Sequence, residues 1–366
     1  MCLYRDWLWR HAAYLLVCLT IQLGLTGCNK TPTAATQQQE FAGNYPIRVT
    51  VTIGMLGDLV RQIGGQHVQV TQLMGAGVDP HLFKPLRDAV LSIREADIVF
   101  YNGLMLEGKM SDLLAQHGRT HRTFAAGDAL SAANVHSGTD SPGAAGDNAQ
   151  HAHPDPHVWM DVALWSQVAQ GVGDELSAFD PKHATDYARA TSQLRGELAQ
   201  LHEYGRQVIG CIPPEQRVLV TSHDAFRYFG EAYGIEVQAV QGISTESEAG
   251  LSRINALVDM LVERQVGAIF TESSVPADSI RALLRGAEAR GHTVRIPEQS
   301  LYSDAMGSEG SYQGTYIGMM DHNYSTIARE LGCPNVPTGG FRDSHNSAAS
   351  SPAEPVPAPL PENDLP

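Results

Sequence analysis

Residues 47–60 read IRVTVTIGMLGDLV and begin an alternation of strand and helix that continues along the chain. From Ile47 to Ile53 apolar and polar residues alternate with period two, which predicts a strand, and Gly54 to Val60 predict a turn into a helix. Further short strands are predicted at His67–Leu73, Ile98–Tyr101, Arg217–Thr221, Glu236–Val240, Val266–Thr271 and Thr293–Ile296. Helical patterns lie between most of them. Strands separated by helices indicate an α/β fold with parallel sheets that helices cover on both faces.

One long helix divides this alternation into two groups. Asp180 and Pro181 predict its start, with Asp as the N-cap and Pro at the first helical position. Apolar residues then recur every three or four positions as far as Val208, which is the pattern of an amphipathic helix. The alternative is a surface helix inside one larger domain. We expect an N-terminal α/β lobe over 46–172, a linking helix over 173–210 and a C-terminal α/β lobe over 211–333.

The first 27 residues are expected to be a signal peptide. They carry basic residues and then an apolar run that is too short and too interrupted to span a membrane comfortably. The run ends in Leu25-Thr26-Gly27-Cys28, which resembles a bacterial lipobox, the motif in which the Cys is lipidated. Polar residues 28–45 would then form a lipidated tether. The alternative is an ordinary signal peptide followed by an incidental Cys.

Composition excludes some functions and limits the cross-links. The formal net charge is −15, which disfavours binding to nucleic acid or to anionic lipid. The segment 334–366 holds 8 of the 20 Pro residues and is expected to be disordered. Cys2 and Cys18 would leave with the signal peptide and Cys28 would be acylated, so only Cys211 and Cys333 could pair. We expect no disulfide.

Four segments combine a metal-binding side chain with a stiff or strand-end backbone. The tripeptide Asp-Pro-His ends at His81 and again at His157; Pro restricts the backbone, and Asp can accept a hydrogen bond from the imidazole or a nearby N–H. His223 follows a predicted strand, and ligands of α/β sheets gather at such ends. Asp304 lies in a Tyr-Ser-Asp-Ala segment, where it could instead be a helix cap. Each His alone could be an ordinary surface or core residue. Together, three imidazoles and one carboxylate suit a divalent cation of the zinc type, held between distant segments.

Seven segments in order carry a family resemblance. They are GVDPHLFKP (77–85), FYNGLMLEGKM (100–110), DPHVWMD (155–161), TSHDAFRYFG (221–230), QGISTESEAG (241–250), FTESSVP (270–276) and LYSDAMG (301–307). Over about residues 47–333 the chain is similar to the zinc/manganese class of metal-binding receptors, which are solute-binding lipoproteins of bacterial ABC importers.

The resemblance implies two similar α/β lobes bridged by one long helix, with one divalent cation, Zn²⁺ or Mn²⁺, bound as cargo in the cleft between them. The family's ligands fall on His81, His157, His223 and Asp304. It implies a transport protein rather than an enzyme, which delivers the cation to an ABC permease in the inner membrane. The lipid on Cys28 would hold it in the cell envelope, on the periplasmic or extracellular side. We expect a monomer with no nucleic-acid partner.

The identity of the metal stays open. Manganese-selective relatives tend to carry Glu at the position of His223, whereas imidazole favours zinc. A bidentate Asp304 would raise the coordination number toward what Mn²⁺ or Fe²⁺ accepts. We expect zinc to bind most tightly, because intrinsic affinity rises from manganese to zinc.

Two features depart from the family pattern. Met105 stands where relatives often carry His, at a position that is not a ligand. The His-rich loop of dedicated zinc receptors is represented only by His136, His151 and His153. These three could capture metal weakly or simply belong to a solvated polar loop.

Two other functions compete with transport. A zinc hydrolase would use three protein ligands and a water, with Glu246, Glu248 or Glu272 as a base. A fourth protein ligand closes that open position and argues against it, as does the lack of any H-E-x-x-H motif. A surface adhesin on the same fold is the second alternative, without independent support in the sequence.

Overall fold

The N-terminal half of the described chain is built on a parallel sheet. In the computed structural model, which describes residues 41–137 and 153–343, four strands stand in the order β2-β1-β3-β4. Ile47 in β1 lies opposite Val68 in β2, and Val49 lies opposite Ile98 in β3. The strands are β1 (Ile47–Val51), β2 (Val68–Gln72), β3 (Ile98–Tyr101) and β4 (Arg122–Ala125); the helices are α2 (Gly54–Gly64), α3 (Arg87–Glu95), α4 (Ser111–His117) and α5 (Val162–Phe179).

The C-terminal half has a smaller parallel sheet, β5 (Val218–Thr221) and β6 (Glu236–Ala239). The two remaining predicted strands run beside it as extended segments joined by isolated parallel bridges, Ala268 to Arg295 and Glu272 to Leu301. The Phe270 N–H donates to the Val220 carbonyl at 2.8 Å, which attaches the first of these segments to β5. The helices are α7 (Arg227–Tyr233), α8 (Leu251–Glu263), α9 (Asp278–Ala289) and α10 (Tyr316–Glu330).

β4 was not predicted from the sequence. Its residues, Arg-Thr-Phe-Ala, alternate too little to signal a half-buried strand. It forms at the edge of the sheet because β3 offers it a backbone ladder, with Ile98 opposite Arg122 and Phe100 opposite Phe124.

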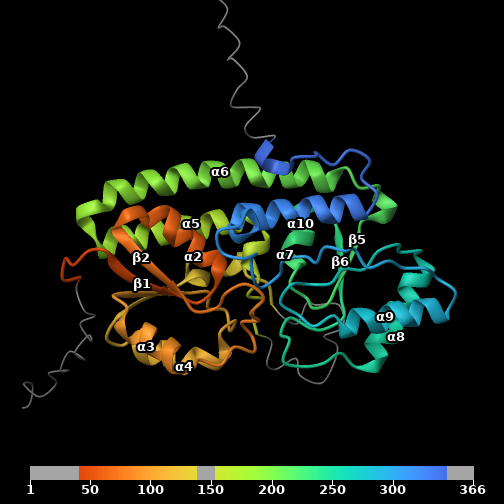
Figure 1. Ribbon diagram of the computed structural model, residues 1–366, viewed down its shortest axis with the longest axis horizontal. Coiled ribbons are helices and arrows are strands. Elements are labelled where there is room, and N and C mark those ends of the chain that lie inside the picture. The colour runs from red at the N-terminus through yellow and green to blue at the C-terminus, as the bar shows by residue number, and fades with distance from the viewer. Residues whose placement is uncertain (1–40, 138–152, 344–366) are drawn as a thin grey trace, which may run out of the picture. The chain divides into compact units, whose positions relative to one another are not determined.

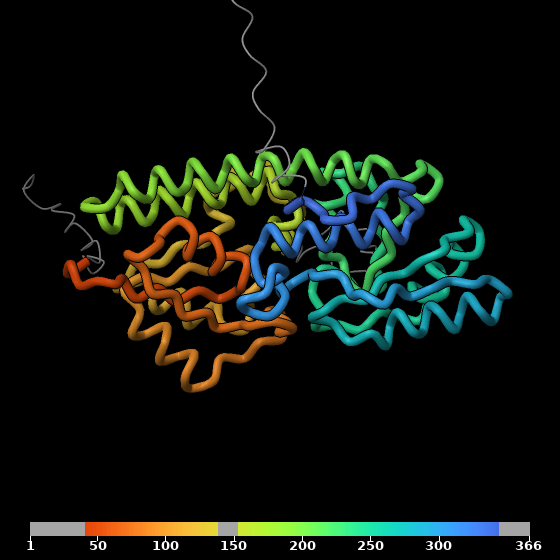
Figure 2. The backbone as a smooth tube through the Cα atoms, turned by 45° about the horizontal axis from the view of Figure 1, so that its top comes forward, coloured from red at the N-terminus to blue at the C-terminus, as the bar shows by residue number. Residues whose placement is uncertain are grey.

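A single long helix serves both halves, and this part of the predicted architecture is confirmed. Helix α6 (Ala184–Gly210) packs against α5 and α2 in the first half and against α7 and α10 in the second. Figure 1 shows it running along both halves, and Figure 2 shows the same relation from another direction. Its approach to α10 requires Gly205, because a Cβ there would lie 2.5 Å from the Tyr324 ring.

The start of this helix differs from the prediction. Pro181–His183 form a 3-10 turn before α6, and the Asp180 side chain makes no capping hydrogen bond to the backbone. Its carboxylate instead accepts hydroxyl hydrogen bonds from Tyr45 at 2.7 Å and Tyr187 at 2.8 Å. Asp180 therefore ties the beginning of the described chain to the long helix.

The largest apolar cluster includes side chains from both halves, among them Ile47 and Val51 of β1 and Leu219 of β5. Helix α10 closes it: the Tyr316 N–H donates to Asp58 of α2 at 2.9 Å, and its hydroxyl donates to the Trp159 carbonyl at 2.6 Å. The halves thus share a core, and the lobe boundaries drawn from the sequence stay a prediction.

The segment from residue 334 is not wholly without structure, which corrects the expectation of a disordered tail beginning there. Phe341 is only 6% exposed, and its ring lies 5.5 Å from that of Tyr204. Its N–H donates to Asp321 at 2.9 Å. One aromatic side chain is enough to dock this segment on α6 and α10, although its Pro-rich composition predicted no core contact. Residues 344–366 lie outside the described chain, as do the predicted signal peptide, Cys28 and tether residues 28–40.

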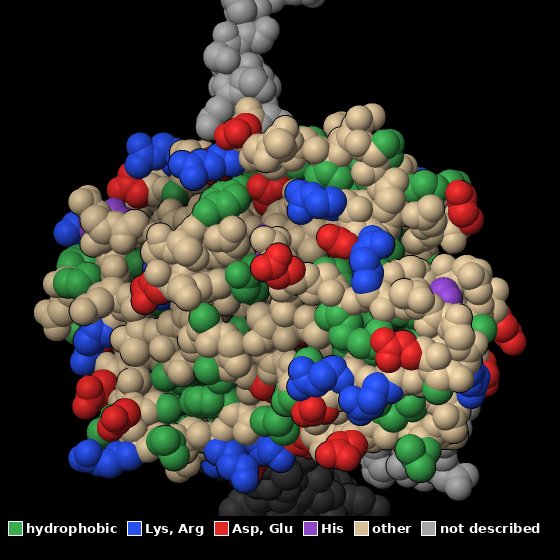
Figure 3. All heavy atoms as spheres, turned by 45° about the vertical axis from the view of Figure 1, so that its right-hand side comes forward, with side chains coloured by type: hydrophobic (Ala, Val, Ile, Leu, Met, Phe, Trp, Pro, Cys, Tyr) green, Lys and Arg blue, Asp and Glu red, His purple; other side chains and the backbone are tan. Residues whose placement is uncertain are grey.

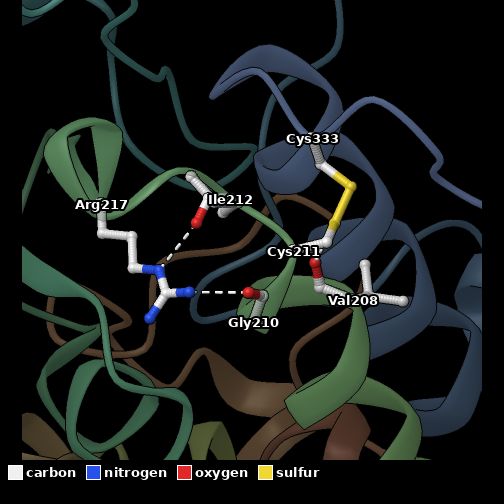
Figure 4. Close-up of a disulfide and its surroundings, with 6 residues drawn as sticks. All are labelled: Val208, Gly210, Cys211, Ile212, Arg217 and Cys333. Carbon is white, nitrogen blue, oxygen red and sulfur yellow. Dashed lines mark hydrogen bonds between the residues drawn. A yellow bond between two sulfur atoms is a disulfide. The ribbon is translucent and has the colours of Figure 1, made fainter.

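The expectation of no disulfide is wrong. Cys211, directly after α6, is bonded to Cys333, just after α10, with their Cα atoms 5.3 Å apart (Figure 4). Beside it, the Arg217 guanidinium donates to the carbonyls of Ile212 at 2.9 Å and Gly210 at 2.6 Å. The two cysteines are 122 residues apart in sequence, so only the packing of α6 against α10 could show that they meet.

No helix within the described ranges is both long and apolar enough to cross a bilayer. On the face shown in Figure 3, Lys and Arg side chains are interspersed with Asp and Glu, and hydrophobic side chains form small scattered groups. That face offers no extended basic surface of the kind that binds nucleic acid.

Candidate metal centre

The structure brings together the four side chains that the sequence singled out. His81 lies in the loop after β2, His157 precedes the 3-10 turn Val158–Met160, His223 follows β5, and Asp304 lies in the loop before α10. One ligand atom from each lies within 4.8 Å of the others, and all four side chains are buried. Each half of the chain supplies two of them.

The distances describe a small, closed cluster. The Nε2 atoms of His81 and His157 are 3.3 Å apart. From Asp304, Oδ1 lies 3.4 Å from His157 Nε2, while Oδ2 lies 3.1 Å from His223 Nε2 and 4.0 Å from His81 Nε2. Both carboxylate oxygens therefore face imidazole nitrogens.

Both oxygens of Asp304 and Nε2 of His223 have no hydrogen-bond partner outside the cluster within the described chain; their contacts are with one another and with His157, at 3.1 and 3.4 Å. A buried polar atom without a partner costs roughly 1–3 kcal/mol. A cation at the centre of the cluster would satisfy all three atoms together.

Carboxylates orient two of the rings. Asp155 Oδ1 lies 2.8 Å from His157 Nδ1, and Glu272 Oε2 lies 2.6 Å from His223 Nδ1. An Nδ1–H that donates to a carboxylate leaves the Nε2 lone pair free for a metal, which is the usual support of a ligating His. The role of Glu272 was missed from the sequence, where it figured only as a base for a hydrolase. The signal available was its place at the end of a predicted strand, in FTESS.

The backbone holds the ligand loops in a repeated way. The His81 N–H donates to Asp79 at 2.9 Å, and the His157 N–H donates to Asp155 at 3.0 Å. The two Asp-Pro-His segments thus fold into the same local turn, as their sequence suggested. Glu272 holds the backbone of the third His in the same way, because its carboxylate accepts the His223 N–H at 3.0 Å.

Burial and charge set the ionisation of the cluster. Burial lowers the pKa of His81 to about 3. Burial also disfavours the cation of His157, but Asp155 and Asp304 outweigh it and raise the pKa to about 9. Burial also disfavours the cation of His223, but Asp304 and Glu272 outweigh it and raise the pKa of this His. Burial disfavours the anion of Asp304, but the imidazoles of His223 and His157 outweigh it and hold the pKa of Asp304 well below its usual range. Without a cation, His157 and His223 therefore carry protons that a metal must displace.

The remaining sequence candidates lie apart from the ligand cluster. His136 contacts Glu231, with Nε2 3.1 Å from Oε2, and His151 and Cys28 lie outside the described residues. His153 and the 51% exposed Met105 line a cavity of about 150 Å³ that His81 also lines. Of the three candidate bases, Glu246 and Glu248 are exposed, and Glu272 is engaged by His223.

Comparison with known proteins places the whole described core in one family. Residues 49–330 match the model of the zinc-uptake complex component A periplasmic family, ZnuA. The chain belongs to this family. The match spans both halves and all four clustered residues, so the resemblance seen in the sequence is confirmed.

Individual members of the ZnuA family are similar over nearly their whole length. The manganese-binding lipoprotein MntA of Bacillus subtilis is 40% identical over 307 residues, 84% of this chain and 95% of MntA. The zinc-binding protein TroA of Treponema pallidum is 38% identical over 290 residues, 79% of this chain and 90% of TroA. The metal ABC transporter substrate-binding lipoprotein SloC of Streptococcus mutans is 28% identical over 324 residues, 87% of this chain and 97% of SloC.

The solved structure of T. pallidum periplasmic zinc-binding TroA superposes with a TM-score of 0.73 at 37% identity, covering 79% of this chain and all of TroA. The predicted α/β class with parallel sheets and one long helix is therefore shared with a family member of known structure.

Proposed function

We propose that this chain captures one divalent cation, Zn²⁺ or Mn²⁺, outside the cytoplasm and delivers it to an ABC permease for uptake. His81, His157, His223 and Asp304 are the ligands. The observation that carries the proposal is the convergence of four buried side chains, with one ligand atom from each. Both oxygens of Asp304 and Nε2 of His223 have no partner outside this cluster in the described chain. Membership of the ZnuA family supports it, as do relatives named for manganese binding, zinc binding and metal ABC transport.

The donor set favours zinc in affinity without excluding manganese from the role of cargo. Three imidazoles and one carboxylate are ligands that zinc prefers, and intrinsic affinity rises from Mn²⁺ to Zn²⁺ at any such site. Both oxygens of Asp304 face ring nitrogens, at 3.4 and 3.1 Å. That carboxylate could therefore bind through one oxygen or both, and two-oxygen binding would suit the higher coordination number of Mn²⁺.

The chain acts as a carrier rather than an enzyme. A hydrolytic zinc centre keeps a position open for water, whereas four protein ligands converge here. Glu272, the candidate base nearest the cluster, accepts two hydrogen bonds from His223 and so holds a ligand in place.

The carrier is attached to the outer side of a membrane as a monomer, through a lipid on Cys28. The lipobox-like segment supports the lipid anchor, and so do the relatives named as lipoproteins. Residues 29–40 would give the folded part reach from the membrane surface. The predicted tether is shorter than 28–45, because Phe41 packs on Phe179 and Tyr45 is hydrogen-bonded to Asp180.

Metal analysis and competition titration test the binding site. We expect one Zn²⁺ or Mn²⁺ per chain, and at least a hundredfold loss of affinity in His157→Ala, because removing a ligand should exceed the roughly 10–100-fold cost of removing a supporting contact. His136→Ala is the matched control, since this His pairs with Glu231 rather than with the cluster. Full affinity in His157→Ala would overturn the ligand assignment.

Growth identifies the cargo. A strain without this chain should fail on medium depleted of one metal and recover when that metal is added. Recovery by zinc alone or by manganese alone names the physiological cation, while normal growth under every depletion would contradict a role in uptake.

A further inference from the structure

The segment between β6 and α8 reaches across to the N-terminal half. The Thr245 hydroxyl donates to Asp79 Oδ2 at 2.6 Å, and Glu246 forms an ion pair with Lys109. Ser244, the residue before them, lines the same cavity as His81 and Met105. We call residues 244–246 the clasp. It adds no ligand to the cluster, yet it contacts the loop that carries one.

Asp79 connects the clasp to the metal site. Its Oδ1 accepts the N–H of His81 at 2.9 Å, while Oδ2 accepts the Thr245 hydroxyl. One carboxylate thus fixes the His81 loop with one oxygen and holds the C-terminal half with the other. The Asp155-Pro156-His157 segment differs, because Asp155 Oδ1 also accepts a hydrogen bond from Nδ1 of the His157 ring. Asp79 is in this way specialised for a contact between halves.

His81 is the ligand nearest the mouth of the site. It is 5% exposed and is the cluster member that lines the cavity of about 150 Å³. The side chains of His157, His223 and Asp304 are fully buried. The same cavity is lined by the clasp residues Ser244 and Glu246, so a cation that leaves through it passes both His81 and the clasp.

On the basis of the proposed function, we propose that the clasp sets the rate at which bound metal is released, with Thr245 acting through Asp79 as the positioning residue. With the Thr245 contact made, the His81 loop is held against the C-terminal half and the cation stays enclosed. With it broken, His81 and Asp79 are free to move away together. The Lys109–Glu246 pair adds to this at the rim of the same opening.

The two contacts should contribute unequally. The Thr245 hydrogen bond ends on a carboxylate and is partly buried, and such charge-assisted bonds are the stronger kind. The Lys109 and Glu246 side chains are 37% and 46% exposed, so solvent screens their attraction. We expect removal of the hydroxyl to speed release about tenfold or more, and removal of the Lys109 charge to speed it about two- to fivefold.

Stopped-flow release of Zn²⁺ and Mn²⁺ into excess chelator tests this with matched variants. Thr245→Val keeps the shape and removes the hydroxyl, while Thr245→Ser keeps the hydroxyl and should release at the rate of the unmodified chain. Lys109→Met is paired with Arg281→Met, which removes the exposed partner of Asp278 on α9. Because the clasp supplies no ligand, the ratio of zinc to manganese affinity should stay constant in all four variants.

Two results separate the clasp from the function on which it rests. Release from Thr245→Val at the unmodified rate, with one metal bound, would overturn the clasp and leave metal capture standing. Absence of bound metal in the unmodified chain would overturn the proposed function and the clasp with it. Equal acceleration in Thr245→Ser and Thr245→Val would also count against the clasp, since packing and not the hydroxyl would then matter.

Discussion

Two of the three imidazoles in the cluster are oriented by carboxylates, and the third by its loop. Asp155 and Glu272 each accept both the backbone N–H and the ring Nδ1 of the His they support. Asp79 accepts only the backbone N–H of His81 and turns its other oxygen to Thr245. Of the three His in the cluster, His81 is therefore the one whose position depends most on the contact between halves.

Replacing Glu272 by Gln should weaken metal binding without removing a ligand. A Gln side chain has one acceptor oxygen, so it can keep one of the two hydrogen bonds from His223 and loses the negative charge. We expect zinc affinity to fall about 10–100-fold, the usual cost of losing such support, as measured by competition titration. Glu231→Gln, which changes a carboxylate that pairs with His136, is the control. Unchanged affinity in Glu272→Gln would show that the His223 ring is held by other contacts.

Replacing His223 by Glu should shift preference toward manganese. The change exchanges an imidazole for a second carboxylate ligand, which suits the harder Mn²⁺. Zinc affinity should fall more than manganese affinity, because the lost imidazole nitrogen is a donor that zinc prefers and the new carboxylate oxygen is one that Mn²⁺ accepts well. The ratio of the two affinities, measured by competition in unmodified and variant chains, should move by about tenfold or more. A constant ratio would contradict the assignment of His223 as a ligand.

The sequence revealed the four proposed ligands more readily than the residues that support them. Pro80 and Pro156 mark stiff turns that a reader of the sequence can recognise, and the order of the family motifs names the same residues. Glu272 and Thr245 carry no comparable local signal, because their roles arise only when distant segments pack together. A hydrogen bond between Thr245 and Asp79 cannot be inferred from the spacing of either residue.

At the scale of elements, α6 and α10 form the part of the fold that both halves share. Gly205 lets the two helices approach, and the Cys211–Cys333 disulfide joins their C-terminal ends. Periodicity predicted α6 because a helix repeats its apolar residues locally. The partner of α6 and the disulfide could not be predicted, since both depend on where the chain returns after more than a hundred residues.

Removing the disulfide should lower stability. A cross-link that closes a loop of about 100 residues or more stabilises a protein mainly by restricting the unfolded chain, typically by about 2–5 kcal/mol. We therefore expect the Cys211→Ser, Cys333→Ser double variant to have a free energy of unfolding lower by about that amount, measured by denaturant titration of the metal-free chain. Zinc affinity should stay near that of the unmodified chain, because neither Cys supports a ligand. Equal stability of the two chains would show that packing of α6 on α10 already supplies the restriction.

At the scale of the whole molecule, two halves with separate sheets meet around one charged cluster and one shared core. In the first half β1, β2 and β3 were predictable because each alternates or is continuously apolar, whereas β4 was not. In the second half only β5 and β6 form a ladder, and the segments after α8 and α9 pair through isolated bridges. Phe341 completes the core from a segment whose composition suggested disorder. Tertiary packing, which local patterns do not record, decides each of these differences.

The same cluster should make metal binding strongly dependent on pH. This dependence should extend to higher pH than the range in which a free imidazole titrates. The pKa of His157 is raised to about 9 and that of His223 is also raised, so both rings hold protons at neutral pH in the metal-free chain. His81, whose pKa is lowered to about 3, adds no competition there. Because bound imidazoles must be neutral, each cation displaces about two protons, and affinity should fall about a hundredfold for each pH unit below neutrality.

The stability of the metal-free chain should change with pH in the opposite direction. A His whose folded-state pKa is raised stabilises the fold fully below its unfolded value near 6.5 and loses this contribution as pH rises through the folded value. For His157 this loss is complete just above pH 9. Raising pH from 6.5 to 9 should thus lower the melting temperature of the metal-free chain while it strengthens metal binding.

Calorimetric titration of metal in buffers of different ionisation enthalpy counts the protons that metal binding releases, with His136→Ala as a control that should release the same number. Release of no protons at pH 7 would show that the rings are already neutral and would contradict the charge balance inferred for the cluster.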